Sequence, residues 1–328
     1  MFAAIAVLAG IIAGLVLAGF LFRGAKKPVD DTKKLRCFDP YLHHGFRPNA
    51  SGTLRWGRRA VPYFTNSLGF RDRACRQVAK FSGNRRIVAL GDSFLEGLGV
   101  AYEHTVTGYL EDWYNQDGKP IEVLNGAVAS YSPFLEYRSL KRFFESGYRA
   151  DEIVVFLDIS DVQDEAIAEY HLLAENENFH SSVHEGRRPP VRQRFWEVIL
   201  FGTQEEKHRY YSTRDRWTED RRLFEEYGRR GVQRCKENLL RIKKLAAANG
   251  AQMKIVLYPW PVQIRSRKSP SRYETIFGAF AGQEQIPVIN LVPVFRSMRD
   301  WQDYFLSGDV HWNEKGHRFV AASLKNEL

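Results

Sequence analysis

The sequence Arg86-Ile-Val-Ala-Leu-Gly-Asp-Ser-Phe-Leu-Glu-Gly-Leu-Gly99 joins a short apolar run to a glycine-rich turn. The apolar run has the length of a buried strand, and the Gly-Asp-Ser that follows is typical of a tight turn into a helix. This arrangement presents the hydroxyl of Ser93 at the end of the strand. Taken alone, the same pattern also fits an ordinary turn in which a serine caps a helix.

A second polar motif lies near the C-terminus, where the chain reads Gly308-Asp-Val-His-Trp-Asn313. A nucleophilic serine needs a base that removes its proton and a carboxylate that orients the base. Asp309 and His311 supply these two groups, and with Ser93 they predict a serine site for acyl transfer. His317 follows on the expected closing helix, and we expect a structural role for it.

The two motifs together resemble the first and last sequence blocks of the SGNH/GDSL hydrolases. The Asp-x-His-Trp spacing is similar to that of the branch related to bacterial polysaccharide O-acetyltransferases and esterases, and the resemblance spans roughly residues 40–326. It implies that Ser93 attacks an ester carbonyl, that His311 is the base and that Asp309 orients it. It also implies an acyl ester or carbohydrate substrate, with no cofactor and no metal.

Strand and helix patterns alternate after the serine motif. They predict strands at 86–90, 121–124, 152–157, 253–258 and 288–291, and helices at 104–116, 133–147, 231–249 and 314–325. Such alternation is typical of a parallel sheet covered by helices on both faces. With the resemblance, it predicts a three-layer α/β/α fold with a parallel, five-stranded, flavodoxin-like sheet, whose catalytic loops lie at the carboxyl ends of the strands.

The rest of the chain predicts several further regions. We assign residues 2–22 to a transmembrane anchor, 23–36 to a linker, 37–84 to an irregular lead-in module and 85–328 to the catalytic domain. Within that domain, residues 163–230 form a long excursion that contains His171, His180, His184, Trp196, Phe201, Tyr210, Tyr211 and Trp217. Its aromatic content predicts a mostly helical cap beside the active site. His180 and His184 lack a third ligand in context, so we expect them to be solvent-exposed.

The lead-in module contains the segment Asn66-Ser-Leu-Gly-Phe-Arg-Asp72, which resembles an element of membrane-linked members of the family. It predicts a turn built on Asn66 and Gly69, with Arg71 in a salt bridge. The alternative is that this segment lines the rim of the site.

The expected oxyanion site departs twice from the family pattern. The resemblance implies three donors, which are the backbone N–H of the nucleophile, a glycine N–H and an asparagine side chain. Here the first is Ser93, whereas Ser130 and Ser160 stand where glycine and asparagine are usual. The donor at 130 is retained if φ is negative there, but the hydroxyl of Ser160 is shorter than a carboxamide. Losing one donor typically slows catalysis by about 100- to 1000-fold, which Asp161 or Asn125 could offset.

Several residues are candidates for contact with the substrate. Trp260, after the fourth strand, and Trp312 could stack on a sugar ring, although core packing explains them equally well. Asn125, at the end of the second strand, is a further candidate for substrate binding. Asp92 and Asp161 adjoin the same blocks, and we expect both to hydrogen-bond the loop backbone.

The anchor segment, residues 2–22, contains no charge and no proline. A helix of this length spans about 31 Å, which is the thickness of a bilayer core. A signal peptide has a basic n-region and a shorter apolar core, so we predict an uncleaved single-pass anchor. Small residues recur at every fourth position and suit close packing against a membrane-protein partner or a second copy, although they are also simply common in membrane helices: Ala6, Gly10, Gly14 and Ala18.

Charge gives conflicting indications of the membrane side. The positive-inside rule favours a cytoplasmic main domain, because basic residues follow the anchor at Arg23, Lys26, Lys27, Lys33, Lys34 and Arg36. The resembling enzymes mostly act outside the cytoplasmic membrane, so the resemblance favours a periplasmic domain, which we adopt. The formal charge of +9 is dispersed and accompanies no nucleic-acid motif. We therefore expect lipid headgroups or an acidic polysaccharide, and no nucleic acid, near this surface.

The three cysteines do not form a disulfide framework, because their number is odd. Cys37 and Cys75 could pair in an oxidising compartment, whereas Cys235 falls in a helical pattern and is expected to be buried.

Two functions of different classes fit these observations. The first is a membrane-anchored serine esterase or O-acyltransferase that acts on acyl groups, chiefly acetyl, of a cell-envelope or secreted carbohydrate. The second is a catalytically impaired carbohydrate-binding or assembly subunit of a polysaccharide-modification complex. The departures at Ser130 and Ser160 favour the second, whereas intact Ser93, Asp309 and His311 favour the first, which we adopt. A lipase fits less well, because no large apolar loop marks an acyl groove.

Overall fold

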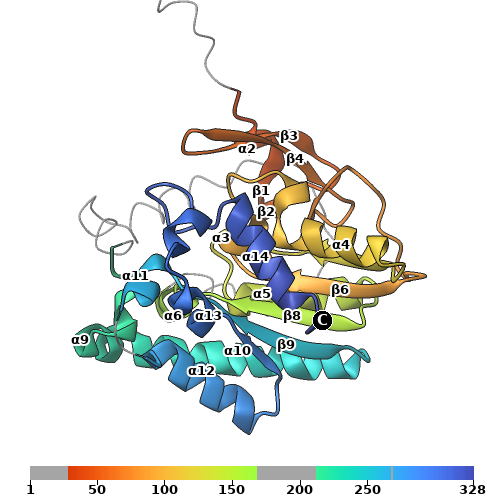
Figure 1. Ribbon diagram of the computed structural model, residues 1–328. Coiled ribbons are helices and arrows are strands. Elements are labelled where there is room, and N and C mark those ends of the chain that lie inside the picture. Colours follow the sequence, from red (N-terminus) through yellow and green to blue (C-terminus); the bar gives the residue numbers. More distant parts are fainter. Residues whose placement is uncertain (1–28, 168–211, 267–268) are drawn as a thin grey trace, which may run out of the picture. The chain divides into compact units, whose positions relative to one another are not determined.

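The computed structural model describes residues 29–167, 212–266 and 269–328. Contacts divide the chain into two units, Met1–Asp30 and Asp31–Leu328, and the second contains the elements described below (Figure 1). The predicted anchor over 2–22, with its small residues Ala6, Gly10, Gly14 and Ala18, lies outside the described residues. Within the described ranges, no helix combines the length and the apolar character that crossing a membrane requires.

An eight-stranded sheet with the order β10-β9-β8-β6-β7-β5-β4-β3 organises the second unit. Its strands are β3 (Ser51–Trp56), β4 (Arg59–Thr65), β5 (Arg71–Asp72), β6 (Arg85–Leu90), β7 (Ile121–Asn125), β8 (Glu152–Leu157), β9 (Gln252–Leu257) and β10 (Val288–Asn290). The pairings from β10 to β7 are parallel, and those among β7, β5, β4 and β3 are antiparallel. The prediction of five strands was therefore incomplete, because three antiparallel strands of the lead-in module extend the sheet at its β7 edge.

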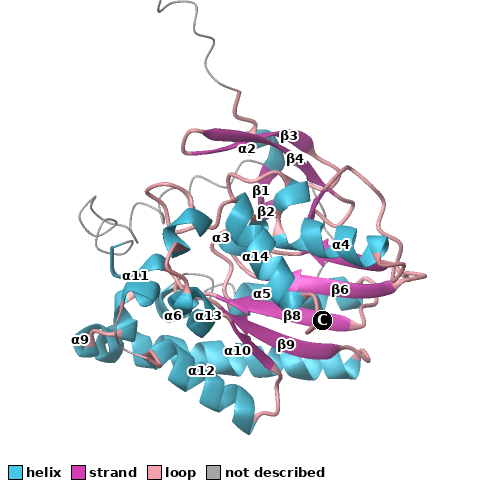
Figure 2. Cartoon of the chain, viewed as in Figure 1, coloured by secondary structure: helices cyan, strands magenta, loops and turns pink. Residues whose placement is uncertain are grey.

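Helices alternate with the parallel strands along the chain (Figure 2). The longer ones are α4 (Val106–Gln116), α5 (Pro133–Glu145), α10 (Arg229–Ala248), α12 (Arg272–Gln283) and α14 (Glu314–Leu324). The shorter ones are α2 (Thr32–Leu35), α3 (Ser93–Glu96), α6 (Asp161–Ile167), α9 (Arg221–Leu223), α11 (Pro261–Arg265), α13 (Val292–Ser297), η1 (Tyr102–His104), η3 (Arg216–Thr218), η4 (Phe224–Gly228) and η5 (Trp301–Tyr304). The four helices predicted from apolar spacing correspond to α4, α5, α10 and α14.

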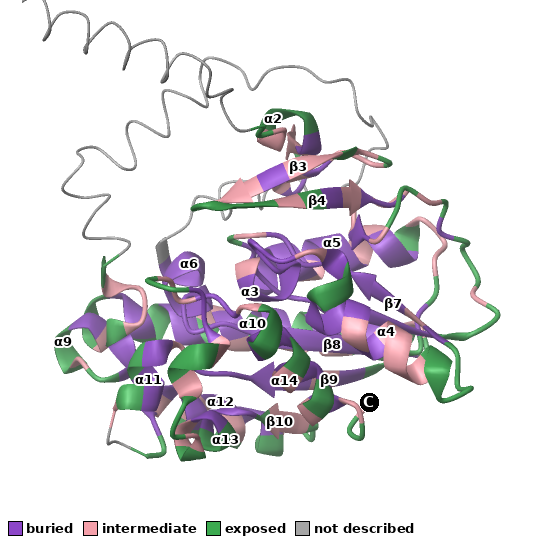
Figure 3. Cartoon of the chain, turned by 45° about the horizontal axis from the view of Figure 1, so that its top comes forward, coloured by how far each residue is buried: buried purple, intermediate pink, exposed green. Residues whose placement is uncertain are grey.

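Two apolar cores lie on opposite faces of the parallel strands. Successive side chains of a strand point to opposite faces, and in β6 Val88 and Leu90 enter the core that α5, α10 and α12 cover. Ile87 and Ala89 enter the other core, which α4, α13 and α14 cover. β8 is buried along its whole length, whereas β3 and β4 are partly exposed (Figure 3). The three predicted layers are thus present.

The lead-in module adds more regular structure than its composition indicates. After α2, a hairpin pairs β1 (Arg36–Asp39) with β2 (His43–Phe46), and β3, β4 and β5 follow. The segment predicted as a turn is one, since Asn66 Oδ1 accepts from the N–H groups of Leu68 and Phe70, and Gly69 has φ +73°.

The predicted salt bridge of Arg71 is not found among the described residues. The Arg71 guanidinium instead donates to the backbone carbonyls of Glu96, Gly97 and Val100. It also stacks on the ring of Tyr63, 4.5 Å from the ring centroid. The reason is its position beneath the loop that follows α3, whose carbonyls need donors. Arg71 thereby holds the loop that follows α3, the short helix that begins at Ser93.

Only parts of the predicted cap are described. Residues 163–167 and 212–230 are largely helical, and Trp217 is buried, with its indole N–H donating to the carbonyl of Ile159 at 2.9 Å. The other residues assigned to the cap lie outside the described residues: His171, His180, His184, Trp196, Phe201, Tyr210 and Tyr211. The three cysteines are free, with Cys75 exposed, Cys37 half-buried and Cys235 buried.

Candidate active site

Ser93 lies at the carboxyl end of β6, on the turn into α3. Asp92, and not the serine, caps this helix, because its Oδ1 accepts from the N–H of Phe94 at 2.9 Å. Gly91 keeps the turn tight, since a Cβ there would lie 3.1 Å from the Cβ of Phe156 and 3.2 Å from that of Leu95. The local sequence therefore fixes the turn and leaves the serine hydroxyl at its surface.

His311 and Asp309 come from the loop that precedes α14. The N–H of Leu306 donates to the carbonyl of His311 at 2.8 Å, and Phe305 pairs with Trp312 in an isolated antiparallel bridge. Asn313 then caps α14 by accepting from the N–H of Gly316 at 3.0 Å. The loop is thus fixed at both ends.

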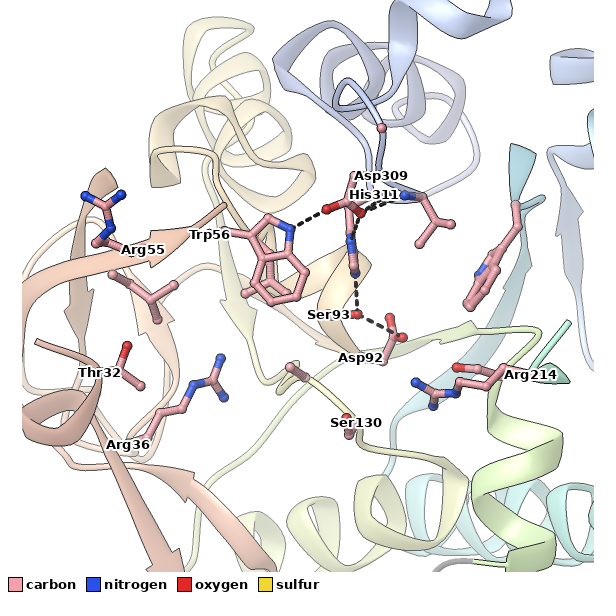
Figure 4. A pocket seen from close by; sticks show the side chains of 17 residues that line it. Thr32, Arg36, Arg55, Trp56, Asp92, Ser93, Ser130, Arg214, Asp309 and His311 are labelled. Atoms are coloured by element: carbon pink, nitrogen blue, oxygen red, sulfur yellow. Dashed lines mark hydrogen bonds and ion pairs between the residues drawn. The ribbon is translucent and has the colours of Figure 1, made fainter. Parts of the chain in front are cut away.

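A hydrogen-bonded chain joins the three residues (Figure 4). His311 Nε2 lies 2.7 Å from Ser93 Oγ, and His311 Nδ1 lies 2.6 Å from Asp309 Oδ1. Burial opposes ionisation of Asp309, but the hydrogen bonds and charge of His311, with a bond from Trp56, outweigh it and hold the pKa of that carboxyl well below its usual range. The ionised carboxylate can therefore orient the imidazole.

Trp56, on β3, is a residue of the site that the sequence patterns did not reveal. Its indole N–H donates to Asp309 Oδ2 at 2.7 Å, and its ring lies edge-on to the His311 ring, with centroids 5.2 Å apart. The two oxygens of Asp309 are therefore held by different partners. A separation of 253 positions divides Trp56 from Asp309, so no local pattern could have identified this contact.

The three side chains open onto a cavity of about 620 Å³. Predicted site residues that line it are Ser93, Ser130, Ser160, Trp260, Asp309 and His311. One wall is formed by Thr32 from α2, Arg36 from β1, and Leu54, Arg55 and Trp56 from β3. The remaining lining residues are Asp92, Leu98, Ala129, Arg214, Gly308 and Val310.

Two residues predicted to contact substrate do not line this cavity. Trp312 is fully buried and packs against Phe94 and Tyr258, so its ring is part of the core. Asn125 is also fully buried, and its amide group bonds to the carbonyl of Leu95 and the N–H of Ala127. Its place in the sheet explains this, since it is the last residue of β7 and its side chain fills the space behind α3. Neither side chain can reach a substrate from there.

The two departures in the expected oxyanion site have different geometries. Ser130 has φ +66°, so the condition of a negative φ is not met, and serine occupies the left-handed conformation that glycine favours. Ser160 donates its N–H to Asp158 Oδ1 at 2.6 Å, while Asp161 Oδ2 accepts from the N–H of Asp158 at 2.8 Å. Asp161 thus organises its own loop and does not line the cavity.

The loop that carries Ser130 is held by α3 and by the lead-in module. The N–H of Ala129 donates to Glu96 Oε2 at 2.6 Å, and its carbonyl accepts from His44 Nε2 at 2.8 Å. Burial, followed by the charge of His43, lowers the pKa of His44 to about 3, so the imidazole is neutral. His317 is likewise buried, and its Nδ1 accepts from the N–H of Val106, which fits the structural role expected for it.

Buried carboxyl groups lie behind the nucleophile. Burial and the charge of Asp158 raise the pKa of Asp92, whose Oδ2 lies 3.3 Å from Ser93 Oγ. Burial and neighbouring acids also raise the pKa of Glu136 and Asp161, and burial raises that of Glu165 to about 7. Among the described residues, no group of three or more His, Cys, Asp or Glu side chains is placed to hold a metal ion.

Serine, imidazole and carboxylate in this hydrogen-bonded order define the class of nucleophilic serine sites that catalyse acyl transfer. The profile of the GDSL-like Lipase/Acylhydrolase family matches residues 89–319, and the chain belongs to this family of ester-bond hydrolases. No curated protein sequence matches the chain.

Solved structures that match this chain include the following three. TesA is 12% identical, with a TM-score of 0.45, over 73% of this chain and 96% of that one. The acetyl xylan esterase AlAXEase is 13% identical, with a TM-score of 0.47, over 74% of this chain and 99% of that one. The psychrotrophic esterase EstA from Pseudoalteromonas sp. is 14% identical, with a TM-score of 0.42, over 74% of this chain and 96% of that one.

Proposed function

We propose that this chain is a membrane-anchored serine esterase or O-acyltransferase that acts on ester-linked acyl groups, chiefly acetyl, of a cell-envelope or secreted carbohydrate. The observation that carries the proposal is the hydrogen-bonded chain of Ser93, His311 and Asp309 on the wall of an open cavity. Family membership supports ester chemistry, and the three residues supply what that chemistry needs.

The first half-reaction acylates the serine. As Ser93 Oγ bonds to the ester carbonyl carbon, His311 Nε2 accepts the hydroxyl proton, and Asp309 stabilises the resulting imidazolium. Collapse of the tetrahedral intermediate breaks the bond to the leaving alcohol. His311 then returns the proton to the alcohol oxygen, so that an acyl-enzyme and a free hydroxyl remain.

The second half-reaction removes the acyl group. A water molecule or a sugar hydroxyl attacks the acyl carbon and gives its proton to His311, and Ser93 Oγ leaves with that proton. Water yields a carboxylic acid, and a sugar hydroxyl yields a new ester. We assign oxyanion donation to the backbone N–H of Ser93, with Ser130 and Ser160 on the cavity wall beside it.

The lining of the cavity supports a carbohydrate substrate. Trp56 and Trp260 provide aromatic surface, and Ser130 and Ser160 provide polar groups around the nucleophile. Sugars present apolar ring faces and many hydroxyl groups, so a mixed lining of this kind suits them.

Active-serine labelling tests the proposal. The full chain is treated with a fluorophosphonate probe beside Ser93→Ala and His311→Ala, and peptide mass spectra locate the adduct. We expect an adduct on Ser93 that both substitutions abolish. The absence of an adduct on folded protein would instead support a non-catalytic carbohydrate-binding or assembly subunit, because Ser160 would then not complete the site.

We further propose that residues 2–22 anchor the protein, with the small residues on one face of that helix packing against a partner, and that the main domain lies in the periplasm. The exposed thiol of Cys75 allows a direct test. A membrane-impermeant maleimide should label Cys75 in spheroplasts, and Cys75→Ser should remove that label. Labelling only after lysis would place the domain in the cytoplasm.

A further inference from the structure

Three arginines line the cavity around the nucleophile. They are Arg36, Arg55 and Arg214, which come from β1, β3 and the segment before η3. In Figure 4 the guanidinium groups of Arg36 and Arg214 point from opposite sides toward the space between Ser93 and Ser130, whereas Arg55 lies farther out. Two forked cationic groups therefore converge where the substrate of Ser93 must lie.

The carboxylates that pair with these two arginines lie behind them. Arg36 bonds to Glu96 at 2.6 Å, and the side chain of Glu96 is fully buried. Arg214 pairs with Asp164, whose side chain is 2% exposed. Neither carboxylate lines the cavity. Each ion pair thus orients its arginine and presents the positive member to the cavity.

The acids that do line the cavity leave this positive field largely intact. Burial and the charge of Asp158 raise the pKa of Asp92 well above the usual range, which disfavours its charged form. The two carboxylate oxygens of Asp309 accept hydrogen bonds from His311 and Trp56, so its negative charge is directed to these partners. The face that meets a substrate therefore carries more positive than negative charge.

We propose that the ester substrate carries a carboxylate, as an acylated acidic sugar does, and that Arg36 and Arg214 bind this carboxylate while Ser93 attacks the ester. A planar guanidinium offers several N–H donors in a fork that matches a carboxylate, and the ion pair with Glu96 uses part of the fork of Arg36. This inference rests on the proposed esterase function and names its substrate class.

The test compares two substrates that differ in one charge. They are a singly O-acetylated methyl glucuronoside and the same compound with its carboxylate converted to a methyl ester. Release of acetate by the full chain gives kcat/KM for each. We expect a preference of about tenfold or more for the charged substrate, because charge-assisted hydrogen bonds are lost with the neutral one.

Paired substitutions remove each arginine without leaving a buried charge. Arg214→Gln with Asp164→Asn should abolish the preference while kcat/KM for the methyl ester stays within about threefold. Arg36→Gln with Glu96→Gln should also abolish the preference, and only the ratio of the two substrates is compared for it, because Glu96 also binds the loop that carries Ser130. Arg229→Gln removes an exposed arginine that forms an ion pair with Glu225 on the same helical stretch, and it should leave the preference unchanged.

The outcomes separate the inference from the function on which it rests. Equal kcat/KM for the two substrates, or equal losses on both in the paired variants, would overturn the carboxylate site while leaving an active esterase. No acetate from either sugar, together with no fluorophosphonate adduct on Ser93, would overturn the proposed function itself.

Discussion

The contact between Trp56 and Asp309 makes a sharp prediction about catalysis. Trp56→Phe keeps an aromatic ring in the cavity wall and removes the indole N–H that lies 2.7 Å from Asp309 Oδ2. A hydrogen bond to a charged group contributes about 1.5–3 kcal/mol. The Asp309 side chain is 26% exposed, so water replaces part of the bond and we take the lower value, about 1.5 kcal/mol.

That free energy corresponds to a loss of about tenfold in kcat/KM. It lies well within the roughly 10⁴-fold effect of disabling the carboxylate of such a triad, as expected for a residue that positions Asp309 without replacing it. We expect the loss to fall on kcat, with KM for 4-nitrophenyl acetate changed less than about twofold, because orientation of His311 matters most in the transition state. Fluorophosphonate labelling of Ser93 should slow in proportion.

Trp217→Phe is the matched control. It also removes an indole N–H, one that bonds to the carbonyl of Ile159 at 2.9 Å in the core and away from the cavity. We expect it to lower the Tm and to change kcat less than Trp56→Phe does. The reasoning fails if Trp56→Phe retains kcat/KM within about twofold, or if both variants lose the same fraction of kcat.

Three further predictions concern stability. Neither oxygen of Glu136 has a hydrogen-bond partner among the described residues, and burial, with the charges of Asp92 and other acids, raises its pKa. Glu136 of the folded chain therefore keeps a proton that the unfolded chain releases above about pH 4.3, and the folded state loses stability as the pH rises toward the folded pKa. Glu136→Gln should raise the Tm more at pH 8 than at pH 5. An equal change in Tm at both pH values would refute this. Ser130→Gly should raise the free energy of unfolding by about 1 kcal/mol, because glycine adopts a φ of +66° without strain, and labelling of Ser93 should be retained. A lower Tm would show that contacts of the serine side chain stabilise the fold more than the backbone strain destabilises it. Gly231→Ala should lower the free energy of unfolding, measured in urea, by about 1–3 kcal/mol, because its Cβ would lie 1.8 Å from the carbonyl oxygen of Val162. Gly278→Ala on α12 meets open space and should raise the same free energy by up to about 1 kcal/mol. Changes of the same sign in both variants would contradict the packing of α10 on α6.

Local sequence was sufficient for the parallel strands and for the turn that carries Ser93. An apolar run such as 87–90 is stable only when it is buried, and the neighbouring Gly91 and Asp92 are enough to predict the turn that follows it. Asp309 and His311 were predicted for the same reason, since the relative positions of their side chains are fixed by one short loop. The approach of that loop to Ser93 follows from the parallel topology, which places both at the carboxyl ends of strands.

The lead-in module shows where local reasoning stops. Its Gly, Pro and Arg content predicted irregular structure, but β3, β4 and β5 find partners at the β7 edge, and an exposed edge is satisfied by pairing wherever the chain can reach it. This extension is what brings Trp56 to Asp309, and the β1–β2 hairpin of the same module brings Arg36 to the cavity. Neither residue belongs to a motif, because each acts on groups that are distant along the chain.

The sequence by itself determined the class of chemistry, the alternation of strands and helices, and the identities of Ser93, Asp309 and His311. The tertiary structure alone decided which side chains reach the cavity, burying Trp312 and Asn125 and exposing Trp260 and Arg214 to it. The physical reason is the distance along the chain over which each interaction acts. Turns and amphipathic periods depend on neighbours within a few residues, whereas burial and the surroundings of a charge depend on every element that packs against it.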